Sequence, residues 1–256
     1  MKVRFYMIRR REEIVNAVNR EGQISLAELK EMFPEVSEVT LRKDLQYLNS
    51  TWQLVRVHGG AKSILSTVGD SDNYFARSKK NIEEKQLIAE KASLLIKPNS
   101  SVFIAGGSTC NELTKTLPPF PLYVFTDGLY TAIELAKLDT CTSTIIGGQI
   151  ENNTLRASGP KLLTEFEHLH FDIAFIGTQA YSRDYGFSTS SSHTSLLHRT
   201  LQKCADKLVV LMDHTKVSQP VGPMVMPTAS VHAVVSDGKL DAATLVSFAE
   251  AGVTVY

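Results

Sequence analysis

The segment Gly106-Gly107-Ser108-Thr109 joins two glycines to two hydroxyl side chains directly after an apolar run of strand length. Glycine lets a backbone approach a ligand closely, and hydroxyl and N–H groups at the start of a helix bind anions. The segment is not a Walker loop, because no lysine follows the glycines at the required spacing, and it lacks the Gly-x-Gly-x-x-Gly fingerprint of dinucleotide binding. We therefore predict a site for a phosphate carried by a small molecule.

Four more segments of small and polar residues also follow apolar runs of strand length. In an open α/β sheet ligands bind beyond the carboxyl ends of the strands, so all five segments are expected to line one crevice. Each one alone is more simply a strand-to-helix turn, and it is their number that favours a site. We expect Lys216 to add positive charge near the phosphate and Asp213 to accept hydrogen bonds from sugar hydroxyls. The four segments are Thr126-Asp127-Gly128, Gly147-Gly148, Gly177-Thr178-Gln179 and Asp213-His214-Thr215-Lys216.

The elements that position these segments are predicted to alternate between helices and strands from residue 81 onward. Asn81 and Glu84 have the spacing of a helix cap, and Pro98 follows the helix that they open. Further helices are expected over residues 111–116 and 130–137. The apolar runs predicted as strands are residues 101–105, 122–125, 143–146, 173–176, 208–212 and 233–236. This order indicates a mostly parallel sheet with helices on both faces.

A different arrangement of elements is predicted before residue 62. Ser37 can cap a helix whose residues Leu41, Leu45 and Leu48 share one face, and residues 54–58 alternate like a half-buried strand before two glycines. Helix, helix, turn, helix and wing make a winged helix-turn-helix, whose last helix enters the major groove of DNA. The two upstream helices are predicted from Ile14 and Val18, and from Ile24, Leu26, Leu29 and Phe33 with Ser25 and Glu28 as a capping box.

Basic residues gather on the side of this unit that would face DNA. A small helical domain that docks on another protein has the same helix pattern, and the basic residues favour DNA over that alternative. Within the set, Thr40 and Arg42 are expected at the groove and the other basic residues at the backbone or groove edge. The predicted DNA-contacting residues are Ser37, Thr40, Arg42, Lys43, Arg56 and His58.

Two further charged groups belong to the same unit. Asp44 is expected to pair with a nearby arginine rather than to contact a base. Arg9-Arg10-Arg11 is expected either to be solvated or to face phosphates at the start of the first helix. The two interpretations of this arginine run stay open on the sequence alone.

Composition sets the outer bounds. The chain has 256 residues, enough for two domains, with 27 basic and 27 acidic side chains. Residues 1–62 carry a net charge of +3 and the remainder −3, which fits a DNA-binding domain on an acidic body. The domains are therefore placed at 1–62 and 81–256, with a linker at 63–80. Three widely spaced cysteines and the absence of a long apolar run predict a reduced, soluble, cytoplasmic protein without metal or cofactor.

The chain resembles the DeoR-type bacterial transcription regulators over nearly its whole length. In the first domain the resemblance rests on Ser37-Glu38, Thr40-Leu41-Arg42-Lys43-Asp44-Leu45 and Arg56-Val57-His58-Gly59-Gly60-Ala61. In the second it rests on Gly107-Ser108-Thr109, Gly147-Gly148, Ser158 with Gly159, Phe171-Asp172, Phe175 with Gly177, Gly186 with Ser188-Thr189, and Asp213 with Lys216.

This resemblance implies a fold and a function. The expected architecture is a winged helix-turn-helix followed by a Rossmann-like, ribose-5-phosphate-isomerase-like α/β effector domain. The expected function is regulation of transcription, usually repression, with release by a phosphorylated sugar. Operator DNA is expected to be bound by a homo-oligomer, a dimer or tetramer assembled through the larger domain. The predicted effector-binding residues are Gly107, Ser108, Thr109, Asp127, Gly148, Gln179, His198, Asp213 and Lys216.

Several residues depart from the family pattern. Ala105 and Gln179 stand where the family usually has aspartates, Asp127 where it has asparagine, and His198 where it has lysine. Such groups bind sugar hydroxyls or phosphate, so the usual effector is expected to bind poorly or to be replaced by another.

Two departures from the family pattern fall in the first domain. The turn before Ser37 is one residue longer than is common. Trp52 replaces a usual glycine, and the local turn is therefore expected to differ.

Two other functions are weighed against the regulated repressor. An aldose–ketose isomerase would need a carboxylate base, for which Asp127 and Asp213 remain, but Ala105, Gln179 and the attached DNA-binding unit disfavour it. A regulator with a degenerate pocket would bind DNA constitutively or respond to a protein partner. The sequence offers no metal-site spacing among His193, His198 and His214. Protonated His198 is expected to assist phosphate binding, so that effector affinity would fall as pH rises.

Overall fold

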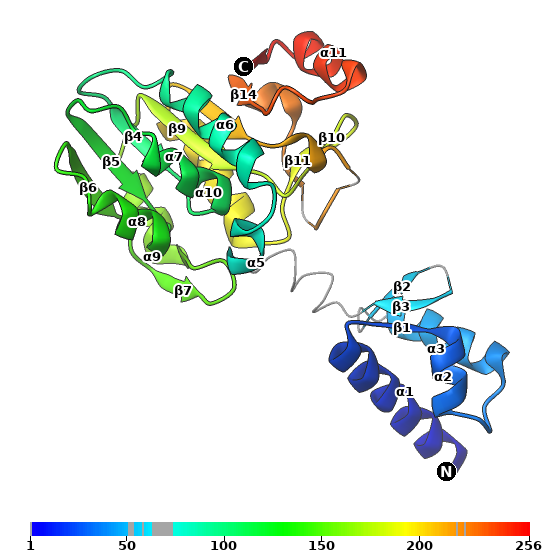
Figure 1. Cartoon of the computed structure of the whole chain (residues 1–256). Helices are drawn as coiled ribbons and strands as arrows, with labels where there is room; N and C mark the ends of the chain where they lie inside the picture. The colour runs from blue at the N-terminus through cyan, green and yellow to red at the C-terminus, as the bar shows by residue number, and fades with distance from the viewer. Residues whose placement is uncertain (1, 51–53, 58, 63–73, 219, 223) are drawn as a thin grey trace. The chain divides into compact units, whose positions relative to one another are not determined.

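The computed structural model describes residues 2–50, 54–57, 59–62, 74–218, 220–222 and 224–256. The chain divides into two compact units, Met1–Ala76 and Arg77–Tyr256 (Figure 1). We call the second the effector domain, and we call the described part of residues 2–62 the N-terminal domain. The predicted linker at 63–80 falls mostly on positions outside the described residues, and its described part includes the short helix α5 (Tyr74–Ser78).

The N-terminal domain has three helices and a small antiparallel sheet. Its last helix α3 is preceded by the predicted cap, since Ser37 Oγ accepts the backbone N–H of Thr40 at 3.2 Å. Ser25 and Glu28 form the predicted capping box at α2. The elements are α1 (Lys2–Glu21), β1 (Gln23–Ser25), α2 (Leu26–Met32), α3 (Glu38–Ser50), β2 (Val55–Val57) and β3 (Gly60–Lys62).

Two details of this domain differ from the sequence prediction. The first helix is one 20-residue element rather than a short helix. Ile24 lies in β1 and not in a helix, because β1 pairs with β3 of the wing, where Ile24 is the partner of Ala61. At Gly60, a side-chain Cβ would lie 2.2 Å from the carbonyl oxygen of Ile24, so the close pairing of these strands requires glycine. A tertiary contact thus overrides the helical spacing of Ile24.

The effector domain is built on a seven-stranded sheet in which all the neighbouring strands that pair are parallel. Its order is β15-β14-β12-β9-β4-β5-β6. The six predicted strands are confirmed as members of this sheet, and the two-residue β15 was not predicted. The strands are β4 (Ser101–Ile104), β5 (Leu122–Thr126), β6 (Cys141–Ile145), β9 (Ile173–Gly177), β12 (Leu208–Leu211), β14 (Ala233–Val235) and β15 (Thr254–Val255).

The strand order reverses direction between β4 and β9. After β4, the strands β5 and β6 are added in turn on one side of it. The strands β9, β12, β14 and β15 are then added in turn on its other side, and all of them stay parallel. Because crossovers between parallel strands are right-handed, the helices of the two halves lie on opposite faces of the sheet. The switch point lies between β4 and β9, and the crevice at such a point is the usual ligand site of an open α/β sheet. The helices are α6 (Ile82–Ser93), α7 (Ser108–Lys115), α8 (Leu129–Leu135), α9 (Pro160–Phe166), α10 (Ser192–Cys204) and α11 (Ala242–Glu250).

Two small sheets and an aromatic cluster complete the domain. The rings of Phe103 on β4, Phe166 at the end of α9 and Phe171 pack together, with centroids 5.3 to 6.0 Å apart, and all three residues are buried. Short hairpin strands extend beyond the main sheet and place polar residues near its carboxyl edge. They are β7 (Gln149–Glu151) with β8 (Arg156–Ser158), and β10 (Ala180–Ser182) with β11 (Gly186–Ser188) and β13 (Met224–Met226); the 3-10 helices are η1 (His214–Lys216) and η2 (Thr228–Ser230).

Candidate functional site

Helix α3 has one buried face and one exposed face. Leu41, Leu45 and Leu48 are buried in the core of the N-terminal domain. Arg42 and Lys43 are exposed. The helix therefore offers a polar, basic surface while its apolar residues hold it in place, as the sequence predicted for a recognition helix.

Asp44 is the charged residue that fixes α3 against α1. Its two carboxylate oxygens accept hydrogen bonds from Arg10 Nε and Arg11 Nε, each at 2.7 Å. The Arg11 guanidinium carbon also lies 3.8 Å from the centroid of the Tyr47 ring, a cation–π contact. The predicted pairing of Asp44 is confirmed. The three arginines of the run differ in role. Arg9 is exposed beside Glu13, whereas Arg10 and Arg11 are largely buried and hold α1 against α3.

The predicted DNA-contacting residues occupy three kinds of environment. Ser37 caps α3, and its hydroxyl lies 2.9 Å from the hydroxyl of Thr40 in the first turn. Arg42 is exposed and lies 3.7 Å from Glu38 one turn earlier. The backbone N–H of exposed Arg56 donates to Asn49 Oδ1 at 2.8 Å, which ties the wing to the end of α3. His58 and Trp52 lie outside the described residues.

The five polar segments lie at the carboxyl ends of β4, β5, β6, β9 and β12, which are neighbours in the sheet. Gly106 is tightly enclosed: its N–H donates to Asp127 Oδ1 at 2.7 Å, and an added Cβ would lie 2.8 Å from Gly128 Cα. Gly107 differs, since an added Cβ would meet no atom within 4 Å. The open side of this turn is therefore at Gly107, at the amino end of α7.

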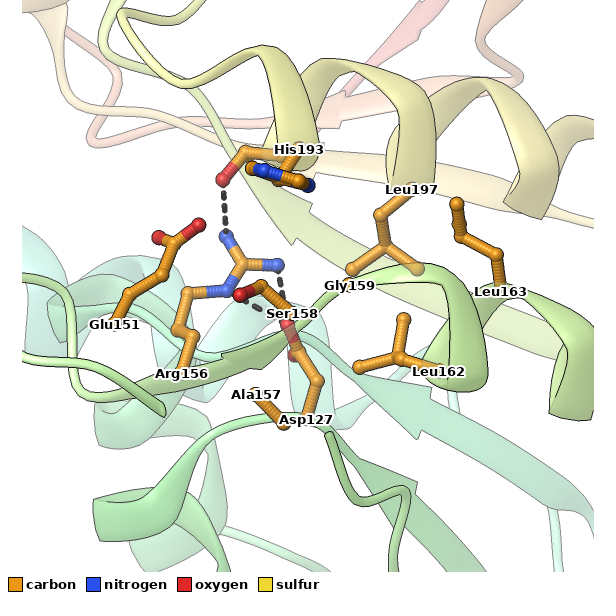
Figure 2. Close-up of a pocket in the computed structure, with 11 residues that line it drawn as sticks. Asp127, Glu151, Arg156, Ala157, Ser158, Gly159, Leu162, Leu163, His193 and Leu197 are labelled. Atoms are coloured by element: carbon orange, nitrogen blue, oxygen red, sulfur yellow. Dashed lines mark hydrogen bonds and ion pairs between the residues drawn. The ribbon is translucent and has the colours of Figure 1, made fainter. Parts of the chain in front are cut away.

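Arg156 is a site residue that sequence reasoning missed. It reaches from β8 to Asp127, with Arg156 Nε and Nη2 each 2.7 Å from Asp127 Oδ2 (Figure 2). Its Nη1 lies 3.5 Å from the hydroxyl of Thr194 at the start of α10. Both charged side chains are buried. The short hairpin that carries Arg156 has no periodic pattern, so nothing local in the sequence marks it.

A small cavity adjoins this ion pair. Its volume is about 10 Å³, room for a single water. Figure 2 shows the Arg156 side chain between the end of β5 and α10, with Glu151 and His193 beside it. Asp127 is the predicted effector residue that lines this cavity, and both of its oxygens already have protein partners. In this conformation Asp127 holds the protein together rather than facing an open site.

Asp213 differs from Asp127 in that one of its carboxylate oxygens has no hydrogen-bond partner. It is fully buried and its Oδ1 accepts hydrogen bonds from the Thr215 N–H at 3.0 Å and from Asn81 Nδ2 at 3.2 Å. Its Oδ2 is buried without a hydrogen-bond partner, and so is Asn111 Oδ1 on α7. Buried polar atoms without partners are uncommon and mark places where a ligand or water belongs. Asn81 was predicted to cap α6, but it has left-handed backbone angles and makes no cap hydrogen bond, because its side chain binds the Asp213 turn instead.

Two lysines lie close to Asp213. The buried ammonium of Lys85 donates to the backbone oxygens of Arg77 and Lys80. Burial, and then the neighbouring charge of Lys216, lowers the pKa of Lys85 from 10.5 to about 8. Within the part of the chain that the structure describes, the half-buried Lys216 ammonium has no hydrogen-bond or ion-pair partner. Lys85 was missed in the sequence because it lies on a helix, outside the strand ends.

The remaining predicted effector residues serve structure in the geometry observed. His198 is buried and its pKa lies well below 6.5, first because of burial and second because of the Arg156 charge. Burial therefore favours the neutral imidazole of His198 in the absence of a ligand, and the role of a protonated His198 in phosphate binding stays a prediction. Gln179 Oε1 accepts the Ser190 N–H. At Gly148 an added Cβ would lie 2.3 Å from the Ser158 oxygen, so this glycine allows two strands to meet.

The described residues contain no cluster of three or more metal-binding side chains. They also contain no helix that is both long and apolar enough to cross a membrane. The buried Cys110 thiol has its pKa raised to about 12 by burial, and the other two cysteines are also free.

A winged helix-turn-helix joined to an α/β domain with a polar crevice defines a class of proteins: DNA-binding transcription regulators with a ligand-sensing domain. Family comparison identifies the two parts separately. Residues 10–67 match the DeoR-like helix-turn-helix domain, and residues 80–238 match the DeoR C terminal sensor domain. The chain belongs to the DeoR family of transcriptional regulators.

Several relatives agree with this placement. The chain is 31% identical to the HTH-type transcriptional regulator GolR of Listeria innocua, over 96% of each chain. It is 25% identical to a putative aga operon transcriptional repressor of Escherichia coli O157:H7 over 96% of this chain and 92% of that one. It is 26% identical to the lactose phosphotransferase system repressor of Streptococcus mutans, over 82% and 84%.

Two solved structures are similar over about half of the chain. Ribose 5-phosphate isomerase A of Methanocaldococcus jannaschii is 14% identical with a TM-score of 0.39, covering 55% of this chain and 56% of that one. A probable sor operon regulator from Shigella flexneri is 12% identical with a TM-score of 0.38, covering 57% and 80%.

Proposed function

We propose that this protein represses a sugar-metabolism operon and releases its operator DNA when a phosphorylated sugar binds the effector domain. The observation that carries the proposal is the buried, unpartnered Oδ2 of Asp213 beside the ammonium groups of Lys85 and Lys216. An anionic ligand with hydroxyl groups would satisfy both kinds of atom at once. Relatives named as repressors of the aga operon and of the lactose phosphotransferase system support a sugar as the ligand.

The chemistry of binding follows from the groups at the strand ends. The phosphate would lie at the open amino end of α7, where Gly107 leaves room and Ser108 and Thr109 supply hydroxyls and N–H groups. Lys216 would form an ion pair with the phosphate, and the buried ammonium of Lys85 would add positive charge nearby without contacting it. Sugar hydroxyls would donate to Asp213 Oδ2 and to Asn111 Oδ1.

DNA binding is assigned to α3 and the wing. The exposed cations Arg42, Lys43 and Arg56 would contact the operator, while Ser37 and Thr40 shape the start of the helix. Half-sites would be bound by a homo-oligomer, dimer or tetramer, assembled through the effector domain in the cytoplasm. His58 belongs to the proposed contact set from its place in the wing sequence.

Isomerase activity is not part of the proposal. Of the two carboxylates that could act as a base, Asp127 is held by Arg156 and by the Gly106 N–H. A base must be free to reach the proton that it removes. We expect the full chain to turn over neither pentose nor hexose phosphates.

The first experiment is a thermal-shift panel of sugar phosphates on the full chain, with wild type and Asp213→Asn compared. A ligand that binds only the folded state raises the melting temperature, by an amount that grows with ligand concentration. We expect one compound to stabilise wild type, to stabilise Asp213→Asn much less, and to release wild-type protein from DNA enriched out of a random duplex library. Inorganic phosphate and the matching unphosphorylated sugar serve as ligand controls.

A second candidate is a regulator without a small-molecule effector. The small cavity and the engagement of Asp127 by Arg156 favour it. It predicts tight DNA binding that no sugar phosphate changes. A panel without any thermal shift, together with specific DNA binding, would replace the first proposal by this one.

A further inference from the structure

Two of the outward-facing residues of α3, Val39 and Gln46, are not among those that the sequence pattern singled out. Each residue of an α-helix advances roughly 100° around the axis. The buried residues Leu41, Asp44, Leu45 and Leu48 define the inward direction of the helix. Among residues 38–49, those that then lie within roughly 40° of the outward direction are Val39, Lys43 and Gln46.

The earlier expectation is shifted by this geometry. Arg42 lies roughly 70° and Thr40 roughly 90° from the outward direction of the helix. Thr40 is also half-buried and engaged with Ser37. Both positions are placed to approach the walls of a groove rather than its floor.

The three outward residues form a surface that no described part of the N-terminal domain covers. Val39 is 63% exposed although it is a branched apolar residue, and Lys43 and Gln46 are also exposed. In a helix-turn-helix the recognition helix lies in the major groove with its N-terminal residues against base edges. The DeoR-like helix-turn-helix match at residues 10–67 therefore identifies one occupant for this surface, the major groove of duplex DNA.

We propose that Val39, Lys43 and Gln46 are the residues that determine operator sequence. Val39 has the chemistry to pack on the methyl group of a thymine, and Gln46 can make a bidentate pair with adenine N6 and N7. Lys43 can donate to O6 and N7 of a guanine. Arg42 contacts phosphate and contributes affinity for any sequence. The inference rests on DNA binding by this domain and is independent of the effector.

The test is selection of bound DNA from a duplex library with a randomised central segment, using the full chain. Wild type is compared with Gln46→Ala and Val39→Ala, and Gln23→Ala removes the same amide from an exposed position on β1 as a control. We expect wild type to prefer adenine at one position of each half-site by about tenfold or more, and Gln46→Ala to lose that preference alone. Val39→Ala should lose a preference for thymine at a neighbouring position, and the control should enrich the wild-type sequence.

Arg42→Ala separates base contacts from backbone contacts. We expect it to enrich the wild-type sequence while binding every duplex more weakly, with a smaller dependence on salt concentration. If Gln46→Ala and Val39→Ala both enrich the wild-type sequence, the assignment is overturned. If Arg42→Ala changes the preferred base, Arg42 belongs to the reading set and the geometric argument fails. Enrichment of no sequence by wild type would count against sequence-specific DNA binding itself, and so against this inference as well.

Discussion

Asp44 in the N-terminal domain and Asp127 in the effector domain are both buried aspartates paired with arginine, and the comparison shows two uses of the same interaction. Asp44 is held by Arg10 and Arg11, whose side chains remain 18% and 17% exposed. Asp127 is held by Arg156, whose side chain is only 8% exposed. When these pairs are broken, Arg10 and Arg11 can turn toward water, whereas Arg156 and Asp127 stay buried.

The surroundings of the two aspartates differ as well. Around Asp44 every carboxylate oxygen has a partner, and the outward face of α3 is left free for a ligand. The effector domain that contains Asp127 also has buried polar atoms without hydrogen-bond partners, Asn111 Oδ1, His198 Nε2 and Asp213 Oδ2. A complete network rigidifies a scaffold, whereas an incomplete one marks a place for a small molecule. The proposed DNA-contacting residues therefore lie outside a core in which Asp44 is fully paired, whereas the proposed effector residues lie among buried polar groups that lack partners.

The largest effect is expected from Arg156→Met. It leaves the Asp127 carboxylate buried with the Gly106 N–H as its remaining partner among the described residues, and breaking a buried pair in this way costs about 3 to 5 kcal/mol of unfolding free energy. The measurement is urea denaturation followed by circular dichroism. Lys137→Met, which breaks an exposed pair with Glu134, is the matched control and should change nothing measurable. A loss no larger than that of the control would mean that Asp127 is not truly enclosed.

A smaller loss, about 2 to 3 kcal/mol, is expected from Asp44→Ala. Arg10 and Arg11 lose their acceptors, but each can turn its guanidinium toward water. The measurement is urea denaturation followed by circular dichroism. Glu13→Ala on the exposed face of α1 is the control. A loss equal to that of Arg156→Met would remove the distinction between the two pairs.

The third effect depends on pH and concerns Lys85. Its pKa is lowered from 10.5 to about 8, so between these values the unfolded chain holds a proton that the folded chain has released. Raising the pH through this window therefore stabilises the fold, by roughly 3 kcal/mol at most. Below pH 8 both states are protonated and the effect is constant. Denaturation of wild type and Lys85→Met at a series of pH values checks this, because the difference between them should change within that window and not below it.

The smallest effect on stability is expected from Asp213→Asn, below about 1 kcal/mol without ligand. The amide oxygen keeps the bonds to Thr215 and Asn81, and the exchanged atom had no partner to lose. Affinity for a phosphorylated sugar should nevertheless fall about tenfold or more, because the acceptor for its hydroxyls is gone. Asp44→Asn is the comparison: it should cost stability, since both oxygens of Asp44 are engaged. Equal losses of unfolding free energy in the two variants would contradict the distinction between Asp44, whose oxygens are both paired, and Asp213, which has an unpaired oxygen.

Local pattern accounts for the helices of the N-terminal domain, for α6, α7 and α8, and for most of the main sheet, but it did not predict α9, α10 or α11. The stripe of leucines on α3, the capping box of α2 and six of the seven strands follow from spacing and composition. Two local predictions were wrong because the residue concerned interacts with a partner that is distant in the sequence. Ile24 pairs with Ala61 of the wing instead of continuing a helix, and Asn81 turns from its own helix to Asp213, 132 positions away.

The sequence by itself determined the order of elements and the collection of polar segments at one edge, because side-chain periodicity defines strands and helices and parallel strands bring their carboxyl ends together. Only the tertiary structure decided which of those polar groups are free. Arg156 meets Asp127 across 29 positions, and nothing local in the sequence marks this partner. Arg10 meets Asp44 across 34 positions, and the sequence predicted an arginine partner for Asp44 without saying which one. Burial then sets the charge of each group, leaving His198 neutral and Lys85 with a lowered pKa. The availability of a side chain for a ligand depends on what packs around it, and that packing is a property of the whole fold.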